Sequence, residues 1–194
     1  MTLGERSTGR DLRPGLSRAA DALTATRMVL AGLLAWLVGV GELEIAAAVL
    51  ATAWVTDALD GVLAGAAGGG TRLGEWDLPA DTLVGAGVLA GLGADGWLPA
   101  PLAVGAIVVL GAAYVLLRNP FPAMALQAFA WGAILWRFWT DRVAAGWVPV
   151  AVAGAIGIAE RRRFVRVVLP AFFRGAAATA RLRRGRDWRM PGSD

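Results

Sequence analysis

Long apolar stretches, separated by short breaks rich in glycine, proline and charged residues, recur along most of the chain. Stretches of this kind are typical of membrane-spanning helices, which need about 17–25 mostly apolar residues. The pattern predicts about six spans, at residues 22–40, 44–66, 77–94, 98–117, 121–139 and 146–159. A soluble helical bundle is the alternative, but the apolar residues face every direction and leave no surface for water. We therefore expect an all-α integral membrane protein.

The arginines predict how these spans are oriented. Four arginines precede the first span, and ten follow the last one, between Arg161 and Arg189. Basic residues concentrate on the cytoplasmic side of membrane proteins. With an even number of spans, both termini of a multi-pass cell-membrane protein would then lie in the cytoplasm. The expected organisation is a cytoplasmic segment at 1–21, a transmembrane domain at 22–160 and a basic cytoplasmic tail at 161–194.

The basic tail leaves two interpretations open. Apolar residues such as Phe164, Val168 and Phe172 share one face at helical spacing, which fits a helix that lies on anionic lipid headgroups. A solvated tail that only fixes the topology is the other interpretation. A nucleic-acid partner is not expected, because nothing else in the chain supports one.

The amino-acid composition limits the kinds of catalysis that this protein could perform. The chain of 194 residues is 57% hydrophobic, and it contains neither Cys nor His. All 19 basic residues are arginines, and the three serines lie near the termini. Thiol nucleophiles, His or Cys zinc sites, imidazole catalysis and lysine Schiff bases are therefore excluded. Any enzyme with this sequence depends on carboxylates, arginines and a metal ion.

Four aspartates are the most informative residues. Asp57 and Asp60 lie in the second expected span, and Asp77 and Asp81 begin the third. A charge inside a span costs about 2.5–3.5 kcal/mol at the helix centre, so four of them need compensation. The spacings i,i+3 and i,i+4 place each pair on one helix face. Because the break between the spans is short, both faces should meet on the cytoplasmic side.

Four converging carboxylates need a cation to remain ionised. Oxygen ligands suit Mg²⁺, Mn²⁺ or Ca²⁺, and such sites usually act on phosphate or pyrophosphate. The alternative is that the carboxylates only cap helices or pair with arginines, as Asp77 could do at a helix start. The glycine-rich stretch between the pairs could approach phosphate oxygens, and Arg72 within it adds a positive charge. A flexible loop would explain that stretch equally well.

The same residues resemble a known motif. The CDP-alcohol phosphatidyltransferase family carries D-x2-D-G-x2-A-R-x8-G-x3-D-x3-D across two transmembrane helices. This chain matches seven of its eight motif residues, at Asp57, Asp60, Gly61, Ala64, Gly74, Asp77 and Asp81. The opening stretch LTATRMVLAGLLA is also similar to the family's first helix. Beyond about residue 95 the resemblance extends only to length, span number and topology.

The resemblance implies a function in phospholipid biosynthesis. The transmembrane domain would transfer a phosphatidyl group from CDP-diacylglycerol to the hydroxyl of a small alcohol and release CMP. Phosphorylated polyols such as glycerol 3-phosphate or inositol phosphate are among the candidate acceptors. The active site would face the cytoplasm, and the protein would be a homodimer, as members of the family generally are.

The resemblance also assigns roles to individual residues. Asp57, Asp60, Asp77 and Asp81 would bind Mg²⁺ or Mn²⁺, and Asp81 would also be the general base. Gly61, Ala64 and Gly74 would lie against the nucleotide, where larger side chains would obstruct it. Arg72 and Arg118 are further candidates for substrate binding; Arg118 would hold an acceptor phosphate, or would only mark the cytoplasmic side.

Two departures from the motif keep other functions open. Gly65 stands where the family has arginine, and two residues instead of three separate Gly74 from Asp77. A member that has lost turnover and acts as a membrane partner is therefore the main alternative. A membrane prenyltransferase would need more helices and two distant motifs. A transporter would also place carboxylates in the membrane, but the spans show no internal repeat.

Overall fold

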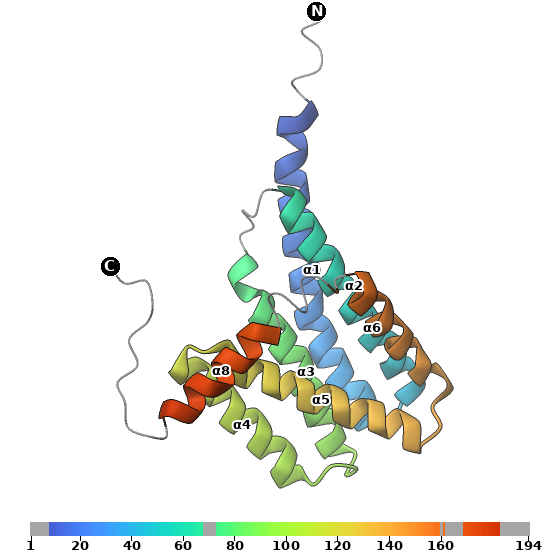
Figure 1. The fold of residues 1–194 in the computed structure, drawn as a ribbon. Helices are drawn as coiled ribbons and strands as arrows, with labels where there is room; N and C mark the ends of the chain where they lie inside the picture. The colour runs from blue at the N-terminus through green and yellow to red at the C-terminus, as the bar shows by residue number, and fades with distance from the viewer. Residues whose placement is uncertain (1–7, 68–72, 160, 162–168, 183–194) are drawn as a thin grey trace, which may run out of the picture.

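The computed structural model describes residues 8–67, 73–159, 161 and 169–182. Helices account for nearly all of these residues (Figure 1). The long helices are α1 (Thr8–Gly39), α2 (Leu43–Ala67), α3 (Asp77–Ala94), α4 (Ala100–Leu117), α5 (Pro120–Thr140), α6 (Trp147–Ala159) and α8 (Leu169–Leu182). Two short 3-10 helices, η1 (Gly74–Trp76) and η2 (Ala144–Gly146), precede α3 and α6. The expected all-α architecture is confirmed over the described residues.

The first six long helices correspond closely to the six apolar stretches. The main difference is α1, which begins at Thr8 and continues through residue 21 into the first apolar stretch. Among the described residues, three segments are long and apolar enough to cross a membrane: Gly15–Gly39, Leu43–Ala66 and Ala100–Leu117. Ala144–Ala159 is a shorter apolar helical segment. A membrane protein is therefore supported, while six crossings and the three-part division of the chain stay predictions.

Glycine, asparagine and proline residues between the apolar stretches mark where helices end and begin. Gly41 has a φ of +80°, a left-handed conformation that glycine adopts without steric cost, and it reverses the chain between α1 and α2. The amide of Glu42 then donates to the carbonyl of Leu37, which closes the end of α1. At the start of α5, the side chain of Asn119 accepts a hydrogen bond from the amide of Phe121, and Pro120 occupies the first turn.

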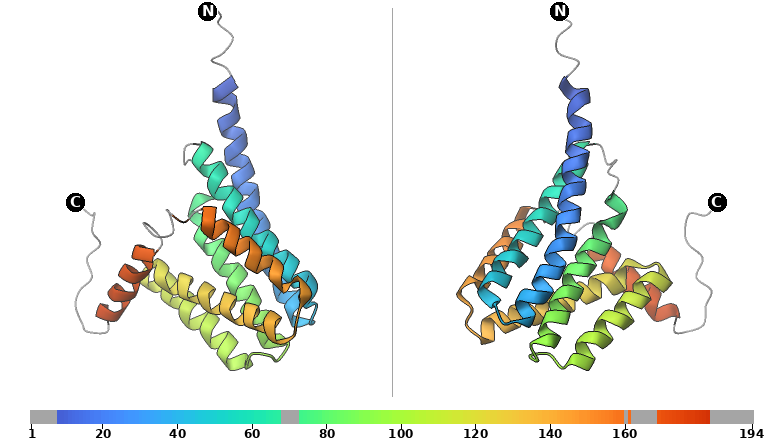
Figure 2. Two further views of the ribbon diagram at one scale, coloured as in Figure 1. Left: turned by 45° about the vertical axis from the view of Figure 1, so that its right-hand side comes forward. Right: turned by 180° about the vertical axis from the view of Figure 1, so that it is seen from behind.

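Helices α1, α2 and α3 lie side by side and form the centre of the molecule (Figure 2). The core between them is built from aliphatic side chains with no exposed surface, among them Leu34, Val38, Leu50 and Leu89. The approach of α1 to α3 is unusually close. A Cβ atom on Gly87 would lie 2.3 Å from the carbonyl oxygen of Ala31, and one on Gly91 would lie 2.8 Å from that of Ala35. Only glycine fits at these crossings.

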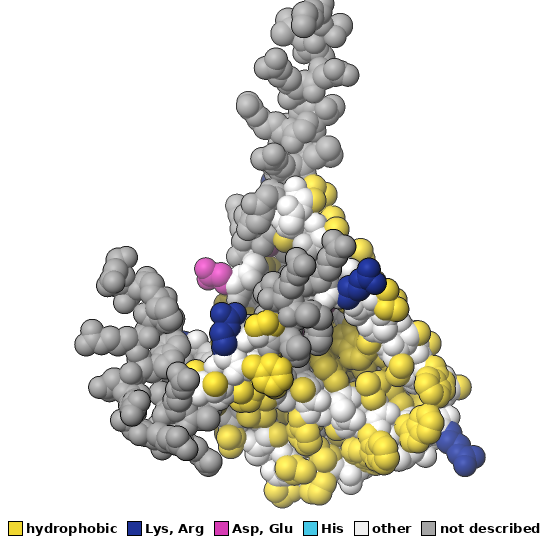
Figure 3. Space-filling model, viewed as in Figure 1, with side chains coloured by type: hydrophobic (Ala, Val, Ile, Leu, Met, Phe, Trp, Pro, Cys, Tyr) yellow, Lys and Arg dark blue, Asp and Glu magenta, His cyan; other side chains and the backbone are white. Residues whose placement is uncertain are grey.

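The outer surface of the helices is largely apolar. Val115 and Leu116 on α4 and Ile158 on α6 are about 70–80% exposed. Hydrophobic side chains cover much of the lower face of the molecule over α5 and α6 (Figure 3). In water such a surface would be unfavourable, whereas lipid tails can solvate it. The surface therefore supports placement in a membrane.

Part of the basic tail forms the amphipathic helix α8, which packs on the start of α5. The side-chain amide of Asn119 donates to the carbonyl of Gly175 at 3.2 Å, and the rings of Phe121 and Phe172 lie 5.1 Å apart. A Cβ on Gly175 would come within 2.8 Å of the Phe121 Cβ, so the contact requires glycine. Phe172 thus faces another helix. The expected face through Phe164 and Val168 lies outside the described residues.

Candidate active site

Two helices supply the four aspartates to one cluster. Asp57 and Asp60 lie near the C-terminal end of α2, and Asp77 and Asp81 lie in the first two turns of α3. One carboxylate oxygen from each of Asp57, Asp77 and Asp81 lies within 4.8 Å of the others. The predicted meeting of the two pairs is therefore observed. The shorter spacing between Gly74 and Asp77 has not turned the second pair away from the first.

The four carboxylates differ in their access to solvent. The side chains of Asp57 and Asp77 are 45% and 44% exposed, and that of Asp81 is 24% exposed. Asp60 is 7% exposed and accepts a hydrogen bond of 2.9 Å from the hydroxyl of Thr24 on α1. The cluster therefore has an open side made by three aspartates and a buried side at Asp60.

Sequence reasoning missed the residue at the centre of the cluster, Arg27 of α1. Its guanidinium forms ion pairs with all four aspartates; the shortest approach to Asp57 is 2.5 Å. The arginine is completely buried. A signal was present, because an arginine within an apolar span is as costly as an aspartate and needs a partner of opposite charge.

The cluster retains an excess of negative charge. Four carboxylates and one guanidinium give a formal charge of −3. Closely spaced like charges are unfavourable at low dielectric unless a cation neutralises them. Three of the carboxylates present oxygen atoms close enough together to share one ion. Hard oxygen donors of this type fit Mg²⁺ or Mn²⁺, so Asp57, Asp77 and Asp81 could hold a divalent cation.

The small residues of the motif are accessible to solvent to different degrees. Gly61 is exposed on α2, Ala64 is half-buried one turn later, and Gly74 is exposed at the start of η1. A Cβ on Gly65, which stands at the position of the motif arginine, would meet no atom of the described residues within 4 Å. Arg72 lies outside the described residues.

A second residue that sequence reasoning missed is Asp21, which ties α1 to the chain just before η1. The carboxylate of Asp21 accepts a hydrogen bond of 2.8 Å from the amide of Leu73. This contact fixes where the chain emerges from the glycine-rich segment and begins η1. No sequence feature pointed to it, because the two residues are 52 positions apart.

Arg118 lies apart from the cluster in a neighbouring cavity. It is the C-cap residue of α4, lies in the turn that leads to α5, and has a left-handed φ of 48°. The cavity has a volume of about 410 Å³, and its walls include Leu78 of α3, Tyr114, Val115 and Pro120. Leu78 directly follows Asp77, so this cavity adjoins the helix turn that carries part of the acidic cluster.

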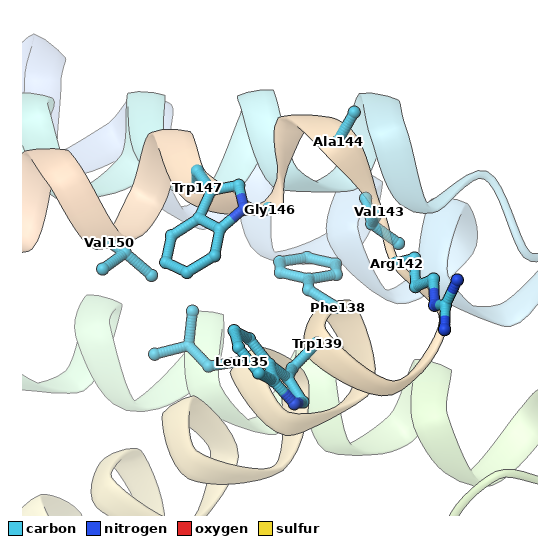
Figure 4. Close-up of a pocket in the computed structure, with 9 residues that line it drawn as sticks. All are labelled: Leu135, Phe138, Trp139, Arg142, Val143, Ala144, Gly146, Trp147 and Val150. Carbon is cyan, nitrogen blue, oxygen red and sulfur yellow. The ribbon is translucent and has the colours of Figure 1, made fainter.

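Another cavity lies at the opposite end of the molecule. It has a volume of about 430 Å³ between the end of α5 and the start of α6, where Phe138, Trp139 and Trp147 form its walls (Figure 4). Among the described residues that line it, Arg142 is the single charged one. The side chain of Glu44 accepts hydrogen bonds from the first amides of η2 at this end. Glu44 is thirteen residues from Asp57 along α2, or about 20 Å, so this cavity does not belong to the acidic cluster.

Comparison with known proteins identifies the family. A model of the CDP-alcohol phosphatidyltransferase family matches residues 18–159, which include α1 from Arg18 onward, the whole acidic cluster and Arg118. No curated protein and no solved structure matches the chain. The matched region covers well over half of the 194 residues and carries the motif residues around which the site is built. The chain belongs to the CDP-alcohol phosphatidyltransferase family.

Proposed function

We propose that this protein transfers the phosphatidyl group of CDP-diacylglycerol to the hydroxyl of a small alcohol and releases CMP. The family implies transfer of a phosphatidyl group from a CDP-alcohol in lipid synthesis. The observation that carries the proposal is the convergence of Asp57, Asp77 and Asp81 within 4.8 Å at the open side of a buried charge cluster. Neutralising phosphate charge is the main catalytic task in phosphoryl transfer, and this arrangement suits it.

Asp57, Asp77 and Asp81 would hold Mg²⁺ or Mn²⁺. A bound divalent cation would supply positive charge to the pyrophosphate oxygens and to the departing phosphate. Asp60 is also a predicted ligand, although its carboxylate lies deeper and contacts Thr24 and Arg27. Gly61, Ala64 and Gly74 would leave space for the nucleotide, and Arg72 would bind its phosphates.

Asp81 would act as the general base. Its carboxylate takes the proton of the acceptor hydroxyl, and the acceptor oxygen forms a bond to the phosphorus that carries the diacylglycerol. The bond from this phosphorus to the bridging oxygen breaks, and CMP leaves with that oxygen. The partial exposure of Asp81, at 24%, is compatible with contact to a substrate on the open side of the cluster.

The acceptor would approach through the cavity between α3 and the turn after α4. Arg118 and Tyr114 line this cavity together with Leu78, the neighbour of Asp77. A guanidinium at this position suits an acceptor that carries its own phosphate, such as glycerol 3-phosphate or inositol phosphate. The acceptor test is CMP release by purified protein with these two alcohols, inositol and serine. CMP release with one acceptor supports the proposal. Binding of CDP-diacylglycerol without CMP release under any condition favours a family member that has lost turnover.

Replacing Arg118 by glutamine tests the role of the cavity. If Arg118 binds an acceptor phosphate, the KM for the phosphorylated acceptor should rise about tenfold or more, because a hydrogen bond to a charged group contributes about 1.5–3 kcal/mol. The KM for CDP-diacylglycerol should change little. Arg142→Gln, at the opposite end of the molecule, is the matched control. An unchanged acceptor KM in Arg118→Gln would show that Arg118 only marks the cytoplasmic side.

We further propose that the chain crosses the cell membrane six times, with both termini and the active site on the cytoplasmic side. The excess of arginine before the first span and after the last one supports this orientation. A homodimer is the state that the family resemblance implies. The domain between residues 22 and 160 would then contain the complete catalytic site of each subunit.

A member without turnover, acting as a membrane partner, is the second candidate. The observation that favours it is Gly65, which removes the arginine expected beside the pyrophosphate. The variant Gly65→Arg is a direct test, because a Cβ atom at this position would meet no described atom within 4 Å. A protein that releases CMP only after this substitution would support the alternative. Release by the natural sequence would contradict it.

A further inference from the structure

Asn119 connects the start of α5 to the tail helix α8. The residue is buried, with 7% of its surface exposed. Its Oδ1 atom accepts a hydrogen bond of 3.0 Å from the amide of Phe121, and its Nδ2 atom donates one of 3.2 Å to the carbonyl of Gly175. One side chain therefore caps α5 and binds α8 at the same time. Because Asn119 directly follows Arg118, these bonds also hold the turn between α4 and α5.

The contact between α8 and α5 is close-packed. A Cβ atom on Gly175 would lie 2.8 Å from the Cβ of Phe121 and 2.9 Å from the Oδ1 of Asn119. The rings of Phe121 and Phe172 pack together, with their centres 5.1 Å apart. Helix α8 lies across the start of α5 in the views of Figure 1 and Figure 2. The family match ends at residue 159, so this contact is made by a part of the chain that lies beyond it.

Arg118 has a strained backbone conformation in the same turn. Its φ of 48° and ψ of 34° are left-handed. Residues with a Cβ atom disfavour this conformation, and it persists where surrounding contacts fix it. The next two residues supply such constraints, Asn119 through its two hydrogen bonds and Pro120 through its ring, which restricts φ. Because Arg118 and Pro120 both line the cavity of about 410 Å³, the turn that α8 contacts is part of the cavity wall.

Arg118 is available to an anion, because it is exposed and forms no ion pair with any residue that the structure describes. We propose that α8 holds Arg118 at the cavity and thereby sets the affinity of the protein for the phosphate of the acceptor. Asn119 and Gly175 are the positioning residues of this arrangement. The inference rests on the proposed function in one respect, that the cavity takes a phosphorylated alcohol.

Equilibrium binding of radiolabelled glycerol 3-phosphate and inositol phosphate to the purified full chain tests this proposal. CDP-diacylglycerol is left out, so that no turnover occurs. The variant Gly175→Val places a branched side chain against Phe121, and the Kd of the phosphate that binds should rise about tenfold or more, as expected when a hydrogen bond to a charged group is lost. Ala177→Val adds bulk at an exposed position of the same helix, and this matched control should bind as the natural protein does.

Two further variants separate positioning from a general structural effect. Asn119→Ser keeps an N-cap oxygen for α5 but lacks the amide that donates to Gly175. It should raise the Kd as Gly175→Val does, and it serves as the test if Gly175→Val is poorly folded. The double variant Arg118→Gln with Gly175→Val should bind no more weakly than Arg118→Gln alone, because both changes remove the same contact. Hydrogen–deuterium exchange at residues 118–121 should be faster in Gly175→Val and Asn119→Ser than in the natural protein.

An unchanged Kd in both Gly175→Val and Asn119→Ser would overturn the proposal. Additive losses in the double variant would overturn it as well, because α8 would then act independently of Arg118. If the natural protein bound neither phosphate, the inference would fail even if inositol or serine supported CMP release. Conversely, phosphate binding that responds to these variants, in a protein that releases no CMP, would count against the proposed function and would support the role of α8.

Discussion

An Asp81→Asn variant is expected to lose CMP release by a factor of about 10²–10⁴, the range that general acid–base catalysis contributes. Asparagine has nearly the same shape as aspartate but cannot accept the proton of the acceptor hydroxyl. It is also a weaker ligand for a divalent cation, so the loss should lie toward the upper end of the range. The measurement is the initial rate of CMP release with saturating CDP-diacylglycerol and metal.

The control for this variant is Glu75→Gln, which removes another carboxylate a short distance along the chain. Glu75 lies in η1, is exposed and has no ion pair among the described residues. CMP release by Glu75→Gln should remain normal. Both variants should elute from size-exclusion chromatography as the natural protein does, because Asp81 is part of a cluster that Arg27 still holds through three other carboxylates. Normal release by Asp81→Asn would contradict its assignment as the base.

A Gly87→Ala variant is expected to destabilise the protein and reduce its activity together. The added Cβ would lie 2.3 Å from the carbonyl oxygen of Ala31, and a backbone atom at this distance cannot move without moving α1. Overpacking of this kind costs about 1–3 kcal/mol, and more where the backbone must shift. Ala31 is one helical turn after Arg27, so separating α1 from α3 also moves the guanidinium away from Asp77 and Asp81.

Gly32→Ala is the matched control, because the same methyl group is added on α1 where nothing lies within 4 Å. Alanine favours helix over glycine by about 1 kcal/mol, so this variant should melt at the same temperature as the natural protein or slightly higher. Thermal melting in detergent, combined with the rate of CMP release, separates the two substitutions. Similar melting temperatures for Gly87→Ala and Gly32→Ala would show that the close contact of α1 with α3 does not limit stability.

Much of the fold could be predicted because helix boundaries follow local chemistry. The apolar stretches end at residues such as Gly41 and Pro120, where turn formation or helix initiation is favoured, and the structure changes direction at these residues. The start of α1 at Thr8 was not predicted, because the apolar pattern begins only near residue 22. The residues before it are largely polar and do not show the apolar pattern from which the helices were predicted. Close crossings such as Gly87 against Ala31 depend on the relative placement of two helices, which one sequence does not reveal.

The acidic side of the site was predicted, whereas its basic centre was not. The spacing of Asp57 with Asp60 and of Asp77 with Asp81 is local, so helical geometry alone places each pair on one face. The contacts of Arg27 with these residues span 30 to 54 positions in the sequence. The position of Arg27 within an apolar span indicates that it needs a negatively charged partner. The sequence does not indicate which carboxylates are that partner.

The central claim is that a divalent cation at Asp57, Asp77 and Asp81 enables transfer from a CDP-linked lipid. The most direct measurement is CMP release by protein stripped of metal with a chelator, reconstituted in liposomes with CDP-diacylglycerol and the acceptor panel, and titrated with Mg²⁺ or Mn²⁺. We expect no release without metal and saturable release as either ion is added. Equal release in the chelator and in saturating metal would contradict the account.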